Sequence, residues 1–138
     1  MLLDTHIALW LDSGADRLRQ STQALIGDCW LGGGTILLSA VTAWEIATLV
    51  ATRRVELDRP ASEWLDRFLI QPGVRAVPLS HHAAARAYAF DELEHRDPAD
   101  RLLIATAIEL GCPLVTYDAR IARFAARHGN RYGFAVTA

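Results

Sequence analysis

The stretch DPADRLLIATAIELGCPLVTYD, residues 97–118, decides the fold class of this chain. Its first half predicts a helix over residues 99–110, which Asp97 can cap at the start and Gly111 can end. The short apolar run that follows predicts a buried strand over residues 114–117. A helix that leads within a few residues into such a strand is typical of a parallel α/β sheet.

The same alternation of helix-period stretches and short apolar runs continues on both sides of this segment. Strands are predicted over residues 1–3, 35–39, 74–79, 114–117 and 134–136, and helices over residues 6–12, 21–31, 42–52, 60–70, 80–90, 99–110 and 119–127. We therefore expect an α/β fold, a three-layer sandwich with a central, mostly parallel sheet of four to five strands flanked by helices. No linker or repeat interrupts the pattern, so one domain is expected over residues 1–138.

Composition narrows the class of protein further. The chain has 138 residues, 51% hydrophobic and 22% charged, which excludes a disordered protein. No apolar run approaches the roughly 20 residues that span a bilayer, and no basic residue precedes the first apolar stretch as in a signal peptide. We expect a cytoplasmic protein with no membrane partner. All 14 basic side chains are arginine, and without lysine a P-loop, a protein kinase and a Schiff-base enzyme are excluded.

Charge is distributed unevenly along the chain. The net charge is −2, so the whole protein is not a polycation. Residues 1–95 hold 8 arginines and 12 acids, a charge of −4, whereas residues 96–131 hold 6 arginines and 4 acids, a charge of +2. A basic C-terminal third could bind phosphates, although surface arginines are common.

Acidic residues fall where the predicted strands end. Asp4 follows the first strand, Asp118 follows the fourth, and Glu45 lies in the first turns of the helix after the second. Asp97 and Asp100 occupy the first turn of the helix before the fourth strand. Ligands of open parallel sheets bind beyond the carboxyl ends of the strands. We therefore expect four or five carboxylates in one cleft.

Each acid also has a structural interpretation when it is taken alone. Thr42 and Glu45 have the spacing of a capping box, Asp97 is placed to cap its helix, and Asp118 could form an Asx turn. Asp4 could be solvated beside the terminus. Taken together, four acids at one sheet edge without lysine would repel one another unless a cation lay between them.

The nature of the expected ligands indicates which cation this would be. Carboxylates without cysteine or histidine suit Mg²⁺ or Mn²⁺ rather than zinc. Such an ion takes phosphate oxygens as further ligands and lowers the pKa of a water molecule that can attack a phosphodiester. Metal-dependent phosphodiester hydrolysis is therefore the predicted reaction.

Four motifs occur in an order that resembles a known family. They are LDTH at residues 3–6, SAVTAWEIA at 39–47, HRDPADRLLIATA at 95–107 and LVTYD at 114–118. Together they resemble PIN domains, and specifically the VapC-type ribonuclease toxins of bacterial toxin–antitoxin pairs. This resemblance implies a PIN-like sandwich, an endoribonuclease dependent on Mg²⁺ or Mn²⁺, an RNA substrate, a homodimer, and a VapB-type antitoxin that blocks the site.

The resemblance also implies roles for individual residues. The catalytic and metal-binding acids would be Asp4, Glu45, Asp100 and Asp118. Three accessory residues would lie nearby. Asp97 would cap the helix and act outside the metal ligands, and Thr116 would place a hydroxyl near the metal. Arg101 would hold a carboxylate or a phosphate, unless it is an ordinary surface arginine.

Other functions compete with this interpretation. A PIN-like fold could bind a metal with little catalysis and serve as a protein-interaction module. A receiver domain also gathers acids at a sheet edge, but it needs a lysine, and a phosphatase of the Asp-x-Asp type needs an acid where this chain has His6. For His6 itself, one turn from the predicted site, we expect a packing role, and the alternative is a place just outside the metal ligands.

Overall fold

A parallel sheet forms the centre of the computed structural model, which describes residues 1–14, 16–94 and 96–138. Within these residues the sheet has five strands in the order β3-β2-β1-β4-β5, and every neighbouring pair is parallel. The strands are β1 (Leu2–Leu3), β2 (Ile36–Ser39), β3 (Val74–Val77), β4 (Leu114–Val115) and β5 (Val136–Thr137). The predicted α/β class and parallel sheet are confirmed.

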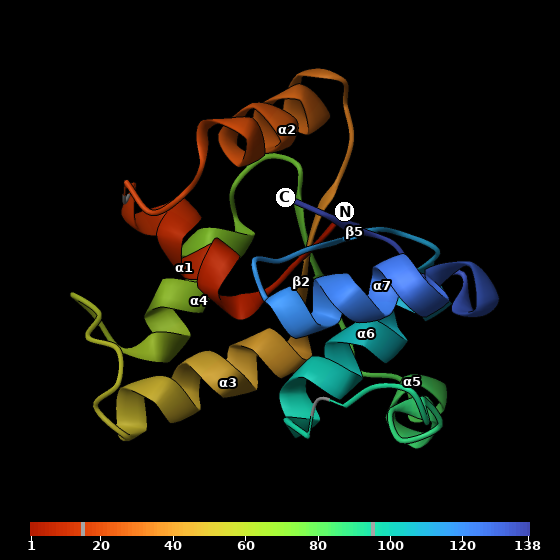
Figure 1. The fold of residues 1–138 in the computed structure, drawn as a ribbon. Coiled ribbons are helices and arrows are strands. Elements are labelled where there is room, and N and C mark those ends of the chain that lie inside the picture. Colours follow the sequence, from red (N-terminus) through yellow and green to blue (C-terminus); the bar gives the residue numbers. More distant parts are fainter. Residues whose placement is uncertain (15, 95) are drawn as a thin grey trace.

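Seven helices flank this sheet in the described part of the chain (Figure 1). They are α1 (Thr5–Ser13), α2 (Gln20–Leu31), α3 (Ala40–Ala51), α4 (Ala61–Leu69), α5 (His81–Arg86), α6 (Pro98–Leu110) and α7 (Ala119–Tyr132). Each corresponds to a predicted helix, although some ends differ from the prediction.

Three helix boundaries depart from the prediction for identifiable reasons. Helix α3 begins at Ala40 because the Ser39 hydroxyl accepts the backbone N–H of Val41 and caps the helix earlier than expected. Helix α5 ends at Arg86, and hydrogen-bonded turns replace the predicted continuation to residue 90. Helix α7 continues to a left-handed glycine, Gly133, beyond its predicted end.

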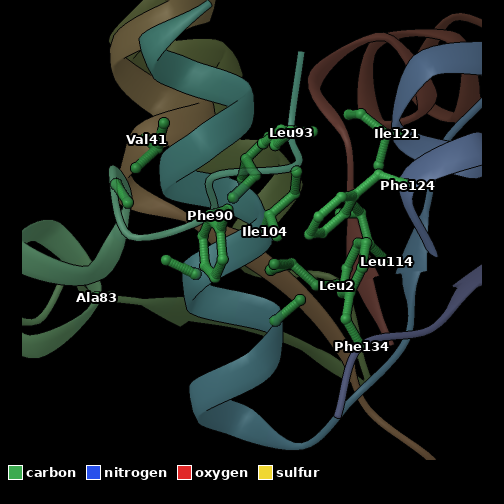
Figure 2. Packing of buried hydrophobic residues seen from close by; sticks show 14 of the residues in the cluster. Leu2, Val41, Ala83, Phe90, Leu93, Ile104, Leu114, Ile121, Phe124 and Phe134 are labelled. Atoms are coloured by element: carbon green, nitrogen blue, oxygen red, sulfur yellow. The ribbon is translucent and has the colours of Figure 1, made fainter. Parts of the chain in front are cut away.

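The side chains of the strands alternate between two hydrophobic clusters, one on each face of the sheet. Leu2 belongs to the cluster covered by α5, α6 and α7, whereas its neighbour Leu3 belongs to the cluster covered by α1, α2 and α4. Figure 2 shows the first cluster, in which Phe90, Ile104 and Phe124 pack beside Leu2. The two clusters and the sheet between them form the expected three layers.

The connections between elements determine where a site can form. Strands β1, β2 and β4 each lead within a few residues into a helix, so the starts of α1, α3 and α7 lie at the carboxyl edge of the sheet. Helix α6 packs against α3 and brings its own first turn to the same region. Among the described residues, no helix combines the length and apolar character needed to cross a membrane.

Candidate active site

An open cleft of about 740 Å³ lies at the carboxyl edge of the sheet. All five acids predicted for this edge line it, and they come from the starts of four different helices. The residues that line the cleft include Asp4, His6, Trp10, Arg17, Glu45, Asp97, Asp100, Tyr117, Asp118 and Arg120. The predicted gathering of carboxylates is therefore present in the fold.

Asp4 is a buried carboxylate, not a solvated residue near the terminus. Its side chain is only 8% exposed, and its Oδ2 accepts a hydrogen bond of 2.5 Å from the hydroxyl of Thr116. The same hydroxyl oxygen accepts the backbone N–H of Asp118 at 3.0 Å. Burial raises the pKa of Asp4, and the bond from Thr116 opposes this shift. Thr116 thus links two of the acids.

Glu45 lies in the second turn of α3, on the side that faces β1 and α1. Its Oε2 accepts a hydrogen bond from the hydroxyl of Thr5. The capping box with Thr42 does not form, because Ser39 caps the helix and the buried hydroxyl of Thr42 has no hydrogen-bond partner among the described residues. Burial, followed by the charges of Asp4 and Asp97, raises the pKa of Glu45.

Asp100, in the first turn of α6, has a carboxyl whose pKa is strongly raised. Burial raises its pKa to about 7, and the charges of Asp4, Asp97, Glu45 and Asp118 add to the shift in that order. In the protein without a metal this carboxyl therefore keeps its proton to a much higher pH than an ordinary aspartate does. Such a shift is typical of functional sites.

Asp97 and Asp118 combine a capping role with a place in the cleft. Asp97 is exposed and accepts the backbone N–H of Ala99 at 2.9 Å, as expected for the cap of α6. Asp118 caps α7 by accepting the N–H groups of Arg120 and Ile121 at 2.7 and 3.0 Å. Capping and a role in the site are thus compatible for both residues.

Arg101 supports the wall of the site rather than lining it. Its guanidinium donates hydrogen bonds to the carbonyls of Ala87 and Leu93 at 3.1 and 2.7 Å and lies 5.0 Å from the ring centre of Tyr88. These contacts hold the turns after α5 against α6. The residues described as lining the cleft do not include Arg101.

Several cleft residues were missed or misjudged from the sequence. His6, expected to pack, is exposed, lines the cleft and lies 5.7 Å from the ring of Trp10. Tyr117 accepts the backbone N–H of Arg19 and donates to the hydroxyl of Thr22. Both residues could have been found from their closeness in sequence to predicted site acids, since His6 lies two residues from Asp4 and Tyr117 directly precedes Asp118.

The donors in the cleft fit a hard divalent cation. Among the described residues, no three side chains of His, Cys, Asp or Glu lie close enough together to form a ready-made metal site. The donors are nevertheless carboxylate oxygens, which suit Mg²⁺ and Mn²⁺. Burial, and after it the charges of the neighbouring acids, raises the pKa values of Asp4, Glu45 and Asp100, so a cation among them would favour their charged forms.

Comparison with known proteins gives the family. Ribonuclease VapC22 of Mycobacterium tuberculosis is 35% identical over 121 residues, which make up 88% of each chain. VapBC2 from Rickettsia felis, solved with a DNA fragment from its promoter, has a similar fold, with a TM-score of 0.64 and 17% identity over 99% of this chain and 96% of that one. FitAcB from Neisseria gonorrhoeae has a TM-score of 0.61 and 21% identity over 99% and 96%. The sequence model of the PIN domain matches residues 1–127, and this chain therefore belongs to the PIN domain family.

Proposed function

We propose that this protein is an endoribonuclease of the VapC type, the toxin of a toxin–antitoxin pair, and that it hydrolyses RNA phosphodiester bonds with Mg²⁺ or Mn²⁺. The observation that carries the proposal is the meeting of Asp4, Glu45, Asp100 and Asp118 in one open cleft. Membership of the PIN domain family and the 35% sequence identity to ribonuclease VapC22 support the proposal.

In the proposed mechanism these four carboxylates would hold the ion. Mg²⁺ or Mn²⁺ would supply a Lewis acid for the phosphoryl group and would lower the pKa of an attacking water. The protein's own contribution is orientation, because hydroxyl groups from Thr116 and Thr5 hold the carboxylates of Asp4 and Glu45. No covalent nucleophile is required.

Charge is the second contribution that the protein can make. Asp100, whose pKa is raised to about 7 by burial and by its acidic neighbours when no ion is bound, would release its proton as the ion binds. The exposed Arg17 and Arg120 on the rim can offset the charge of an incoming phosphate.

The proposal includes a VapB-type antitoxin, a homodimer and a cytoplasmic location. An apolar groove of about 500 Å³ between α3, α4 and β3, lined in part by Ala43, Leu65, Leu69 and Val77, supports a partner chain. Trp44, the chain neighbour of Ala43, is 59% exposed, which suits an interface rather than the core. An antitoxin segment with an arginine would also complement the acidic cleft.

The decisive experiment is cleavage of a structured RNA pool by the purified protein in Mn²⁺, Mg²⁺ or EDTA. We expect cuts that need the metal and that disappear in Asp4→Asn, because this change removes a buried acid but preserves its shape. Asp28→Asn is the matched control, since Asp28 is exposed on α2 and lies outside the cleft.

Expression in cells gives a second readout of the same variants. We expect growth arrest from the parent and from Asp28→Asn, relief by a co-expressed antitoxin, and no arrest from Asp4→Asn. Equal toxicity of Asp4→Asn and the parent would refute the enzymatic mechanism. Metal binding without cleavage or toxicity would favour the protein-interaction module instead.

A further inference from the structure

Three arginines form a row along α7. The proposed mechanism uses only the first of them, Arg120, which lines the acidic cleft. Arg120, Arg123 and Arg127 are spaced by three and four residues, so they share one side of the helix. All three are exposed. A rise of 1.5 Å per residue places the first and last about 10 Å apart along the helix axis.

The row borders a second, smaller hollow that adjoins the acidic cleft. This hollow is lined by the three arginines together with Phe124, His128 and two acids. Arg120 also lines the acidic cleft, so the row begins at the carboxylates and leads away from them. Figure 1 shows α7 on the side of the sheet opposite α4.

The charge of this row is not balanced by its neighbours. Helix α7 contains no acidic residue. Glu92 and Glu94 face the row across the hollow, but Glu92 forms an ion pair with Arg131 and accepts a hydrogen bond from Tyr132 at 2.6 Å. Among the described residues, no ion pair is formed by any of the three arginines in the row. The hollow therefore keeps a net positive charge.

An RNA-cleaving site built from acids needs such a surface. The carboxylates of the cleft repel phosphate groups, and a single ion offsets only part of their charge. Arginines that contact backbone phosphates supply affinity without reading sequence. A row that starts beside Asp118 can hold the nucleotides that flank the reacting bond.

We propose that Arg120, Arg123 and Arg127 bind successive backbone phosphates of the RNA strand on one side of the scissile bond. This inference rests on the proposed ribonuclease function and specifies its substrate as a strand that extends beyond the acidic cleft. The contacts are independent of base identity. Sequence preference would then arise in the cleft itself.

The test compares two double variants of the full chain. Arg123→Gln/Arg127→Gln removes the two arginines of the row that lie outside the acidic cleft. Arg54→Gln/Arg67→Gln is the matched control, because it removes the same charge at two exposed positions. Arg54 lies shortly after α3, and Arg67 lies on α4. Circular dichroism verifies that both fold as the parent does.

Binding is measured in EDTA, where cleavage does not interfere, by the fluorescence anisotropy of a labelled single-stranded RNA of about 20 nucleotides. Each phosphate contact contributes about 0.7 to the slope of log affinity against log salt for single strands. We therefore expect the slope of the row variant to be lower by about 1.4 and its affinity at low salt to fall roughly 10-fold or more. The control pair should bind as the parent does.

Cleavage of the structured RNA pool separates this inference from the proposed function. If the parent cleaves and the row variant matches it in both affinity and salt slope, the inference is wrong and the ribonuclease stands. If the parent binds RNA through the row but does not cleave in Mn²⁺, the three arginines still bind RNA phosphates, and the proposed ribonuclease function is wrong. Absence of RNA binding by the parent, or a row that binds only an acidic protein, would overturn the inference.

Discussion

Replacing Asp100 by asparagine should stabilise the protein when no metal is bound. The carboxyl of Asp100 has a pKa raised to about 7 by burial and by its acidic neighbours, whereas in the unfolded chain the value is close to 4. Between these two values the folded state binds more protons than the unfolded state. The free energy of unfolding therefore falls as pH rises from about 4 to about 7, and the penalty is complete above that range.

The size of this penalty follows from the pKa difference. Three units correspond to about 4 kcal/mol, and because the carboxyl is partly exposed, solvent screening reduces this to about 2 kcal/mol. Asparagine resembles the protonated acid in shape and cannot ionise. Asp100→Asn should thus raise the free energy of unfolding by about 2 kcal/mol at pH 8, or the melting temperature by about 6 °C for a chain of this length.

Thermal unfolding followed by circular dichroism, in EDTA at pH 5 and pH 8, measures this effect. The gain should shrink to less than half at pH 5, because much of the parent's carboxyl is then protonated in the folded state. Added Mn²⁺ should stabilise the parent at pH 8 and stabilise Asp100→Asn less, since one oxygen ligand has lost its charge. A variant less stable than the parent at pH 8, or an equal gain at both pH values, would contradict the electrostatic argument.

Two further substitutions test a hydrogen bond in the site and the end of α7. Thr116→Val should lower the free energy of unfolding by about 1–2 kcal/mol and slow RNA cleavage, because it leaves the buried carboxylate of Asp4 without its hydroxyl donor. Thr48→Val, at an exposed position of α3, is the control. Equal cleavage by both variants would refute the role of Thr116 in orienting Asp4. Gly133→Ala should destabilise the end of α7 by about 1 kcal/mol, since the residue has φ of +65°. Gly27 lies inside α2 with open space where a methyl group would be added, so Gly27→Ala should instead stabilise the protein by up to about 1 kcal/mol in chemical unfolding. A loss of stability in both variants would show that the positive φ of Gly133 does not cause the destabilisation.

The sequence alone predicted the elements whose signals are local. The cap at Asp97, the apolar period of residues 99–110 and the glycine at 111 define α6 without reference to the rest of the chain. The start of α3 was predicted two residues late because Ser39 and Thr42 are both suitable caps, and local sequence does not distinguish them. The prediction that α5 continues to residue 90 was wrong, because the hydrogen-bonded turns after Arg86 outweighed the helix preference of the alanine-rich segment.

The gathering of the acids could also be predicted, for a topological reason. In a parallel sheet the carboxyl ends of all strands lie at one edge, so acids that follow several strands must approach one another. Asp4 and Asp118 meet in this way at the ends of adjacent strands β1 and β4. Residue types and their order along the chain therefore determined the location of the candidate site.

Only the tertiary structure decided how these groups influence one another. The hydrogen bond from Thr116 to Asp4 joins residues 112 positions apart. The raised pKa of Asp100 depends on burial and on acidic neighbours, three of which, Asp4, Glu45 and Asp118, come from other parts of the chain. The arginine period on α7 is visible in the sequence, but its junction with the acidic cleft depends on where β4 places the start of that helix. Hydrogen bonds, desolvation and charge interactions act over a few ångströms in space, and sequence separation does not reveal those distances.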